Sequence, residues 1–175
     1  MDYTLQLLKE AGWYEGRNID VSKHIEKLKW EFRIEALTDV QVQFLKSFAD
    51  LKIIYPALRL RRRGKEIGNV KFLNATKTLD THILKICKGT RSYGVYIAET
   101  HARLKHHDKN LVQIAKDPTG LEVFMSEKGN IYGYFDGGFI CYGNDVMEMF
   151  SAFFHEDKLP VEEIDEEDEG PVPEI

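Results

Sequence analysis

The segment LEVFMSEKGNIYGYFDGGFICY, residues 121–142, decides the predicted fold. Three short runs rich in β-branched and aromatic residues alternate with two turn sequences, at residues 126–130 and 135–139. Each turn sequence contains glycine, which readily adopts the positive φ that tight hairpin connections require. The segment therefore predicts three strands joined by two hairpins.

Similar runs begin near residue 51 and lead up to this segment. They are separated by glycine, proline, asparagine or aspartate, as strands joined by turns usually are. The runs are LKIIY (51–55), ALRLR (57–61), NVKFL (69–73), GVYIA (94–98) and LVQIA (111–115). Because strand–helix alternation of the parallel type is missing, we expect these runs to belong to a mostly antiparallel sheet.

Helical spacing dominates the chain before residue 50. A first helix is predicted from about Tyr3 to Ala11, a second after the cap residue Asp20, and a third after the Thr-x-x-Gln capping box at residues 38–41. Further helices are predicted from Leu79 to Lys88 and from residue 144 onward. The sequence thus predicts an α+β domain in which N-terminal helices pack on the sheet and a C-terminal helix closes the fold.

Charge divides the chain into two parts. The 175 residues suffice for one domain with a real core and carry a net charge of −5. Residues 156–175 contain ten carboxylates and one lysine, a local charge of −9, which leaves +4 for residues 1–155. We therefore expect a folded domain over 1–155 and a disordered acidic tail over 156–175, acting either as a solubilising end or as an arm for a basic surface.

The location of the protein is indicated by weaker signals. The longest run without a charged residue, 137–144, is far shorter than the roughly 20 residues that span a bilayer. The N-terminus lacks an export pattern, and Cys87 and Cys141 form no redox-like or metal-like pair. We expect a cytoplasmic protein with two buried free thiols and no membrane contact.

Two clusters could carry chemistry. The segment 101–108 holds three histidines and Asp108, a set that could bind Zn²⁺ or Ni²⁺, but the neighbouring Arg103, Lys105 and Lys109 oppose a divalent cation. Residues 59–65 hold five cations, which suit either a nucleic-acid patch or, as we favour, a charged edge strand. Phosphate-loop, Gly-x-Ser-x-Gly and His-Glu-x-x-His signatures are missing from the sequence. We expect no enzyme activity, metal, cofactor or direct nucleic-acid binding.

The sequence LKEAGWYEGRNID, residues 8–20, resembles the N-terminus of the SUKH superfamily, and its third subfamily in particular. That group begins with a helix ending in Ala-Gly-Trp, followed by x-x-Gly-Arg and an apolar-Asp step. The sequences EKGNIYGYF (127–135) and FICYGNDVMEMF (139–150) are similar to the family's final hairpin and closing helix. The resemblance covers about residues 4–154. It departs from the family pattern at 48–51, where Phe-Ala-Asp-Leu stands in place of Phe-Gly-Gly-Leu.

The resemblance implies a function. Members of the superfamily are mostly bacterial immunity proteins that bind the toxin domain deployed against competing kin, often a nuclease or a nucleic-acid deaminase. A non-enzymatic cytoplasmic protein that neutralises a cognate toxin, as a monomer or weak dimer, is the leading hypothesis. A scaffold or regulatory protein of the same fold is the alternative, and an enzyme that uses the histidine loop is a third.

Two sets of residues follow as site candidates. The family signature residues, expected to be mainly structural, are Gly12, Trp13, Tyr14, Gly16 and Arg17. Trp13 and Tyr14 are expected to wedge the first helix against the sheet, although exposed anchors for a toxin are the alternative. The tentative toxin-binding residues are Asp136, His106, His107 and Asp108.

Overall fold

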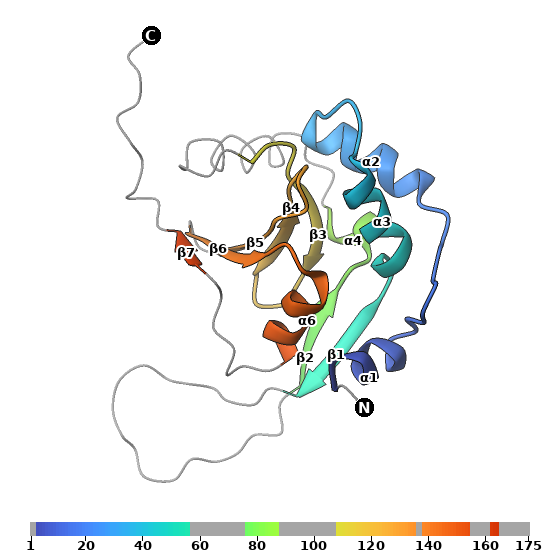
Figure 1. Ribbon diagram of the computed structural model, residues 1–175, viewed down its shortest axis with the longest axis vertical. Helices are drawn as coiled ribbons and strands as arrows, with labels where there is room; N and C mark the ends of the chain where they lie inside the picture. The colour runs from blue at the N-terminus through green and yellow to red at the C-terminus, as the bar shows by residue number, and fades with distance from the viewer. Residues whose placement is uncertain (1–2, 57–75, 88–107, 136–137, 155–161, 165–175) are drawn as a thin grey trace.

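The strands lie side by side in the order in which they occur in the sequence (Figure 1). The computed structural model describes residues 3–56, 76–87, 108–135, 138–154 and 162–164. Within these ranges, a seven-stranded sheet has the order β1-β2-β3-β4-β5-β6-β7, and each neighbouring pair is antiparallel. The strands are β1 (Lys52–Pro56), β2 (Thr76–Asp80), β3 (Val112–Lys116), β4 (Glu122–Met125), β5 (Ile131–Phe135), β6 (Gly138–Gly143) and β7 (Glu162–Ile164).

The helices flank this sheet in the chain order that the sequence predicts. Three of them precede the strands: α1 (Tyr3–Glu10), α2 (Ser22–Phe32) and α3 (Asp39–Phe48). The short α4 (Ile83–Ile86) follows β2, and α6 (Val146–Phe154) follows β6. This arrangement confirms the predicted α+β class with a largely antiparallel sheet and a closing helix.

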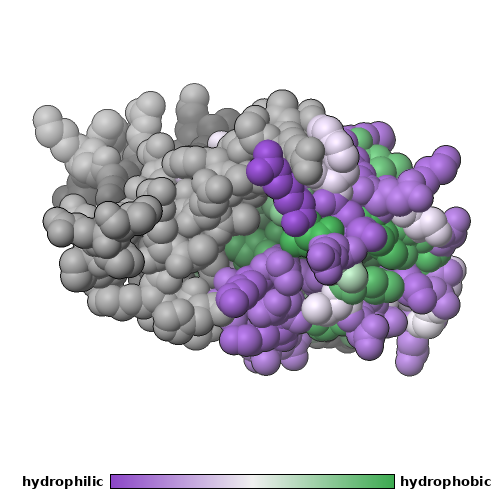
Figure 2. Space-filling view, turned by 90° about the horizontal axis from the view of Figure 1, so that it is seen from above, coloured by the Kyte–Doolittle hydropathy of each residue, from purple (hydrophilic) through white to green (hydrophobic). Residues whose placement is uncertain are grey.

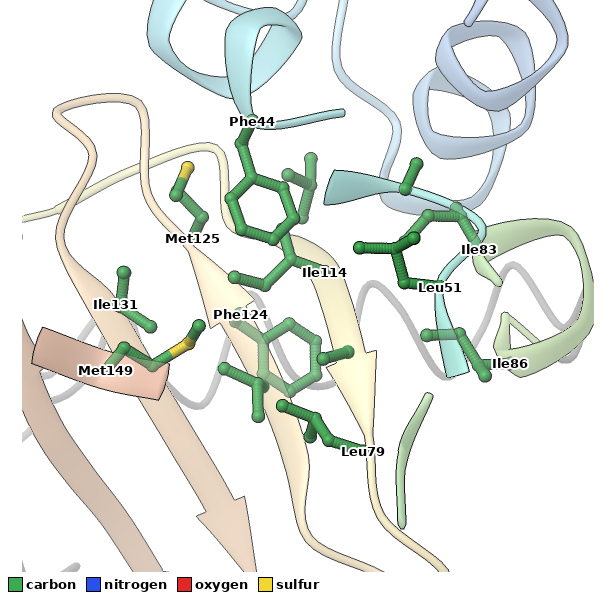
Figure 3. Packing of buried hydrophobic residues seen from close by; sticks show 14 of the residues in the cluster. Phe44, Leu51, Leu79, Ile83, Ile86, Ile114, Phe124, Met125, Ile131 and Met149 are labelled. Atoms are coloured by element: carbon green, nitrogen blue, oxygen red, sulfur yellow. The ribbon is translucent and has the colours of Figure 1, made fainter. Parts of the chain in front are cut away.

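The hydrophobic core forms where the helices meet the sheet. Figure 3 shows Phe44 of α3, Phe124 of β4 and Met149 of α6 converging from three elements. Phe48 of α3 links further parts of the core, because its ring lies 5.9 Å from that of Trp13 and 5.2 Å from that of Phe150. Phe44, Phe124 and Phe150 are buried, and each contributes roughly 1.5–3 kcal/mol through removal of apolar surface from water.

The predicted helix at 79–88 is mostly wrong. Leu79 is paired with Ile53 across β1 and β2, and the helix contains only residues 83–86. Thr81 separates the two elements: its hydroxyl donates to Phe48 O at 2.6 Å and accepts from Leu51 N–H at 2.8 Å. Pairing with β1 therefore overrides the helical spacing of the apolar residues.

The beginning of α2 also differs from its prediction. Val21 occupies the N-cap position, and Asp20 instead accepts from the backbone N–H and the hydroxyl of Ser22, at 3.0 and 2.6 Å. The Asp20 side chain thus stabilises the chain just before the helix. Those hydrogen bonds hold the pKa of Asp20 below its usual value.

Strand β7 falls within the segment 156–175, which the sequence predicts to be a disordered tail. Residues 162–164 pair with β6, with Phe139 opposite Ile164, so the structure differs from that prediction for these three residues. The predicted strands at 57–61, 69–73 and 94–98, and the cationic cluster at 59–65, lie outside the described residues. Among the residues that are described, none of the helices is long and apolar enough to cross a membrane.

Candidate functional site

One corner of the molecule joins the beginning of α3, the segment before β3 and the turn between β4 and β5. We call residues 38–41, 108–110 and 126–130 the corner. Gln41 holds it together from the centre, because its side-chain amide donates to Asn110 O at 2.7 Å and to Met125 O at 3.1 Å. The other end of the same side chain accepts from Thr38 N–H at 3.0 Å, as in a capping box. A fully buried glutamine thereby couples a helix N-terminus to two backbone segments of the sheet.

The turn between β4 and β5 packs tightly beneath α3. Gly129 has φ of +88°, and a Cβ at this position would lie 3.0 Å from Cγ2 of Val40. A side chain here would be strained by its backbone and would also displace the valine. Glu127 N–H donates to Lys109 O at 3.0 Å, which ties the turn to the chain entering β3.

Asp108 is the most constrained carboxylate of the corner. Only 7% of the residue's surface is exposed. It accepts hydrogen bonds from Asn130 Nδ2 at 2.5 Å and from the Tyr132 hydroxyl at 2.7 Å, and Lys128 Nζ lies 3.0 Å from its other oxygen. Burial alone would raise the pKa of Asp108, but these donors outweigh it and hold the pKa well below the usual range.

The pKa of Tyr132, one of these partners, shifts in the opposite direction. Burial raises the pKa of Tyr132, and its hydrogen bond to the Asp108 carboxylate raises that pKa further. Asp108 is therefore an ionised acceptor surrounded by protonated donors. The arrangement fixes residue 108 firmly, and with it the end of the segment that precedes β3.

The tentative toxin-binding residues are distributed unevenly over the structure. Asp108 is buried, and its carboxylate accepts hydrogen bonds from Asn130 and Tyr132 within the fold. His106, His107 and Asp136 lie outside the described residues. Phe135, directly before Asp136 in the sequence, has 51% of its surface exposed at the end of β5. No group of three or more histidine, cysteine, aspartate or glutamate residues within the described ranges could hold a metal ion.

The signature glycines lie at the end of α1 and in the turn that follows. Gly12 has φ of +97°, its N–H donates to Lys9 O, and the N–H of Trp13 donates to Leu8 O at 2.9 Å. These two bonds form a Schellman motif, in which glycine is favoured because other residues are strained at positive φ. Gly16, with φ of +78°, turns the chain again.

The signature side chains have different environments. The Trp13 ring is stacked on Phe48 with an interplanar angle of 3°, and Arg17 is buried with its Nη1 donating to Ser47 O at 3.0 Å. Both side chains thus contact α3 and its end. Tyr14 is 58% exposed, so the expected wedge does not apply to it. The reason is geometric: after the left-handed Gly12, Trp13 folds back onto the core and the next side chain points away.

Two long-range side-chain contacts could not be predicted from the sequence. Gln41 was recognised only as a cap residue, because its contacts with residues 110 and 125 join positions far apart in the chain. The second is the pair between buried His24 and Asp50, whose Nε2 and Oδ2 lie 3.0 Å apart. Asp50 has φ of +62° at the position where the resembling family usually has glycine, and that departure was the available signal.

Comparison with known proteins gives one family. The model of the family described as SUKH-3 immunity protein matches residues 2–156. No curated protein and no solved structure matches the chain. The match extends from the start of α1 through α6, and therefore includes the signature turn, the corner and the hydrophobic core.

Proposed function

Because the chain belongs to the SUKH-3 immunity protein family, we propose that it binds a cognate toxin domain and neutralises it. The observation that carries this proposal is the extent of the family match, which spans residues 2–156 and not a single motif. The protein would act by stoichiometric binding, without a cofactor and without catalysis. We place it in the cytoplasm, where a toxin that enters or is made in the cell would meet it, as a monomer or weak dimer.

We propose further that the toxin acts on nucleic acid, as a nuclease or a related domain. Enzymes of that kind present cationic surfaces to their substrate. The segment 156–175 carries a local charge of −9, which would attract such a surface over a distance and raise the association rate. Charge complementarity supports this assignment of the toxin class.

Two of the candidate contact residues come directly before the corner in the sequence. His106 and His107 precede Asp108 directly, and Asp108 is held by Asn130, Tyr132 and Lys128. A segment attached to a fixed residue loses less conformational entropy when it binds. We therefore propose that residues 101–107 and Asp136 contact the toxin, and that Asp108 positions the first of these segments.

A protection experiment tests the proposal. Candidate toxin domains from genes neighbouring this one would be expressed from an inducible promoter in a bacterial host, with and without the protein. We expect growth to be restored by co-expression and a 1:1 complex to be recovered through a tag on the toxin. If soluble protein gives neither protection nor a complex, the proposed function is wrong.

A catalytically inactive toxin variant makes the second measurement independent of toxicity. It should form the same complex in purified form, because inhibition by binding does not require toxin turnover. A toxin that is destroyed or chemically modified by the protein, and not held by it, would support the enzyme hypothesis.

A further inference from the structure

The outer face of α2 carries a tryptophan in contact with water. Trp30 has 52% of its surface exposed, whereas His24, Leu28, Glu31 and Phe32 of the same helix are buried. With 3.6 residues per turn, position 30 lies on the side of the helix opposite these buried residues. Covering the indole with an apolar pocket of a partner would remove apolar surface from water and so favour binding.

Cationic side chains surround this tryptophan. Residues three, four and seven positions away share its side of the helix, and these are Lys23, Glu26, Lys27 and Arg33. Three of them are positive and one is negative. Lys23, Glu26 and Arg33 are exposed, and Lys27 Nζ lies 4.0 Å from Glu31 Oε2, at the outer limit for an ion pair. The surface next to the indole is therefore net positive.

The helix that presents Trp30 is firmly anchored. Leu28 is completely buried, and the ring of Phe32 meets that of Phe124 of β4 edge-on at 6.1 Å. Arg33 ends the helix in the left-handed conformation, with φ of +54° and its N–H bonded to Lys29 O. Because the helix is held in place, little backbone conformational entropy is lost when a partner binds a side chain on it.

We propose that this face of α2, with Trp30 at its centre, docks an acidic region of the toxin. The indole would enter an apolar pocket, and Lys23, Lys27 and Arg33 would face carboxylates around that pocket. Tryptophan and arginine are the residues most often found where binding energy is concentrated, and opposite charges around them set specificity. The proposal rests on the proposed function, since it assigns the toxin to a surface of this chain.

The charge of this face also determines where on the toxin it can bind. Like charges that meet in an interface cost several kcal/mol, so a cationic face avoids a cationic catalytic groove. The α2 face would therefore bind outside the groove of a toxin that acts on nucleic acid. Figure 2 views the molecule from the side on which α2 lies in Figure 1, and the described surface there is mainly hydrophilic with hydrophobic residues between.

Binding measurements on variants of exposed hydrophobic residues test the proposal. Using the inactive toxin variant as the probe, we expect Trp30→Ala to raise Kd by about 30-fold or more. Ile54→Ala is the control, because Ile54 is exposed to a similar extent on β1, and it should change Kd by less than about threefold. Alanine favours helix more than tryptophan does, so the Trp30 variant should fold normally.

A spectroscopic signal reports the contact directly. The chain has two tryptophans, Trp13 and Trp30, so protein labelled with 5-fluorotryptophan gives two ¹⁹F resonances, which Trp13→Phe assigns. Adding unlabelled toxin should shift the resonance of Trp30 and leave that of Trp13 in place. Reversing two charges with Lys23→Glu and Arg33→Glu should slow association, more so at low salt, and Lys9→Glu on α1 is the control.

Several results would overturn the inference. If wild-type protein binds the toxin and Trp30→Ala binds equally well, the proposed function stands and the α2 face is excluded. Displacement of the toxin by a short DNA or RNA duplex that also shifts the Trp30 resonance would assign the face to nucleic acid. Self-association that Trp30→Ala abolishes would assign it to a second copy of the chain. If wild-type protein does not bind the toxin at all, the proposed function fails and this inference fails with it.

Discussion

Trp13 and Tyr14 are adjacent aromatic residues with opposite environments. Trp13 is stacked on Phe48, whereas Tyr14 is 58% exposed. The residue types of the two do not predict which ring is buried. The left-handed backbone of Gly12 directly before them determines which ring faces the core. A single backbone angle thus assigns a structural role to one residue and leaves the other at the surface.

Replacing Trp13 by alanine should lower the free energy of unfolding by about 3 kcal/mol. This is the low end of the range for such changes, since the ring is only partly buried. Chemical denaturation monitored by circular dichroism measures the change. Tyr14→Ala is the control and should stay within about 0.5 kcal/mol of wild type. Equal losses in both variants would contradict the assigned environments.

Asp108 should make the stability depend on pH. The pKa of its carboxyl is lower in the folded state than in the unfolded chain, where it is about 3.9. The ionised carboxylate therefore contributes fully to the free energy of unfolding above that unfolded pKa. This contribution is lost as the pH falls through the folded pKa. Asp108→Asn should cost about 2–4 kcal/mol at neutral pH, since charge-assisted bonds to buried donors are lost.

Thermal melts of wild type and Asp108→Asn over the acid range test this pH dependence. The two Tm values should approach each other below pH 4. A constant difference between them down to pH 2 would show that Asp108 is not the titrating group.

At the scale of elements, the hairpin strands could be predicted from sequence, and the region 76–88 could not. The runs at 111–115, 121–125, 130–135 and 139–142 correspond to β3, β4, β5 and β6 because turn chemistry and alternation are local signals. Residues Thr76–Asp80 contain a single apolar side chain, Leu79, and their strand conformation depends on pairing with β1. A pairing partner 20 or more residues away in the chain leaves no local sequence pattern.

In the candidate site, too, features set by local sequence could be predicted and contacts between distant residues could not. Glycine positions in the signature turn can be read from the sequence, since positive φ restricts the residue type. The donors around Asp108 come from positions 128, 130 and 132, and the contacts of Gln41 from positions 110 and 125. Only the folded chain brings these residues together, so their roles could not be predicted.

Gln41 should behave as the connector between α3 and the sheet. Gln41→Ala removes the donor to the buried Met125 carbonyl and to the part-buried Asn110 carbonyl, and we expect the free energy of unfolding to fall by about 2–4 kcal/mol. Faster hydrogen exchange should appear in residues 108–112 and 125–130. Gln43→Ala, on the exposed side of the same helix, is the matched control and should have little effect. Unchanged exchange near residue 110 would show that the glutamine does not hold the corner.

At the scale of the whole molecule, negative charge is concentrated in residues 156–175, which follow α6 in the chain. Two truncations separate the effect of this charge from the effect of β7. Deletion of 165–175 removes six of the ten carboxylates and keeps β7. Deletion of 156–175 removes all ten carboxylates and the strand as well. The shorter deletion should leave Tm unchanged and slow association with the toxin, with a larger effect at low salt than at high. Stopped-flow or surface-binding kinetics at several salt concentrations measure this. Association rates that are identical at every ionic strength would mean that these carboxylates serve solubility only.

The order of the sheet has a consequence for how such a protein can diverge. Among the described strands, those that are consecutive in the chain are also neighbours in the sheet, so each connection between them crosses only one strand spacing. Lengthening such a connection costs little closure entropy, about 0.6 kcal/mol for each doubling, and requires no rethreading of the chain. Insertions and deletions between strands can therefore accumulate while the register of the sheet is kept. A lineage under pressure from changing adversaries could vary these connections freely, and would show its greatest length variation between consecutive strands.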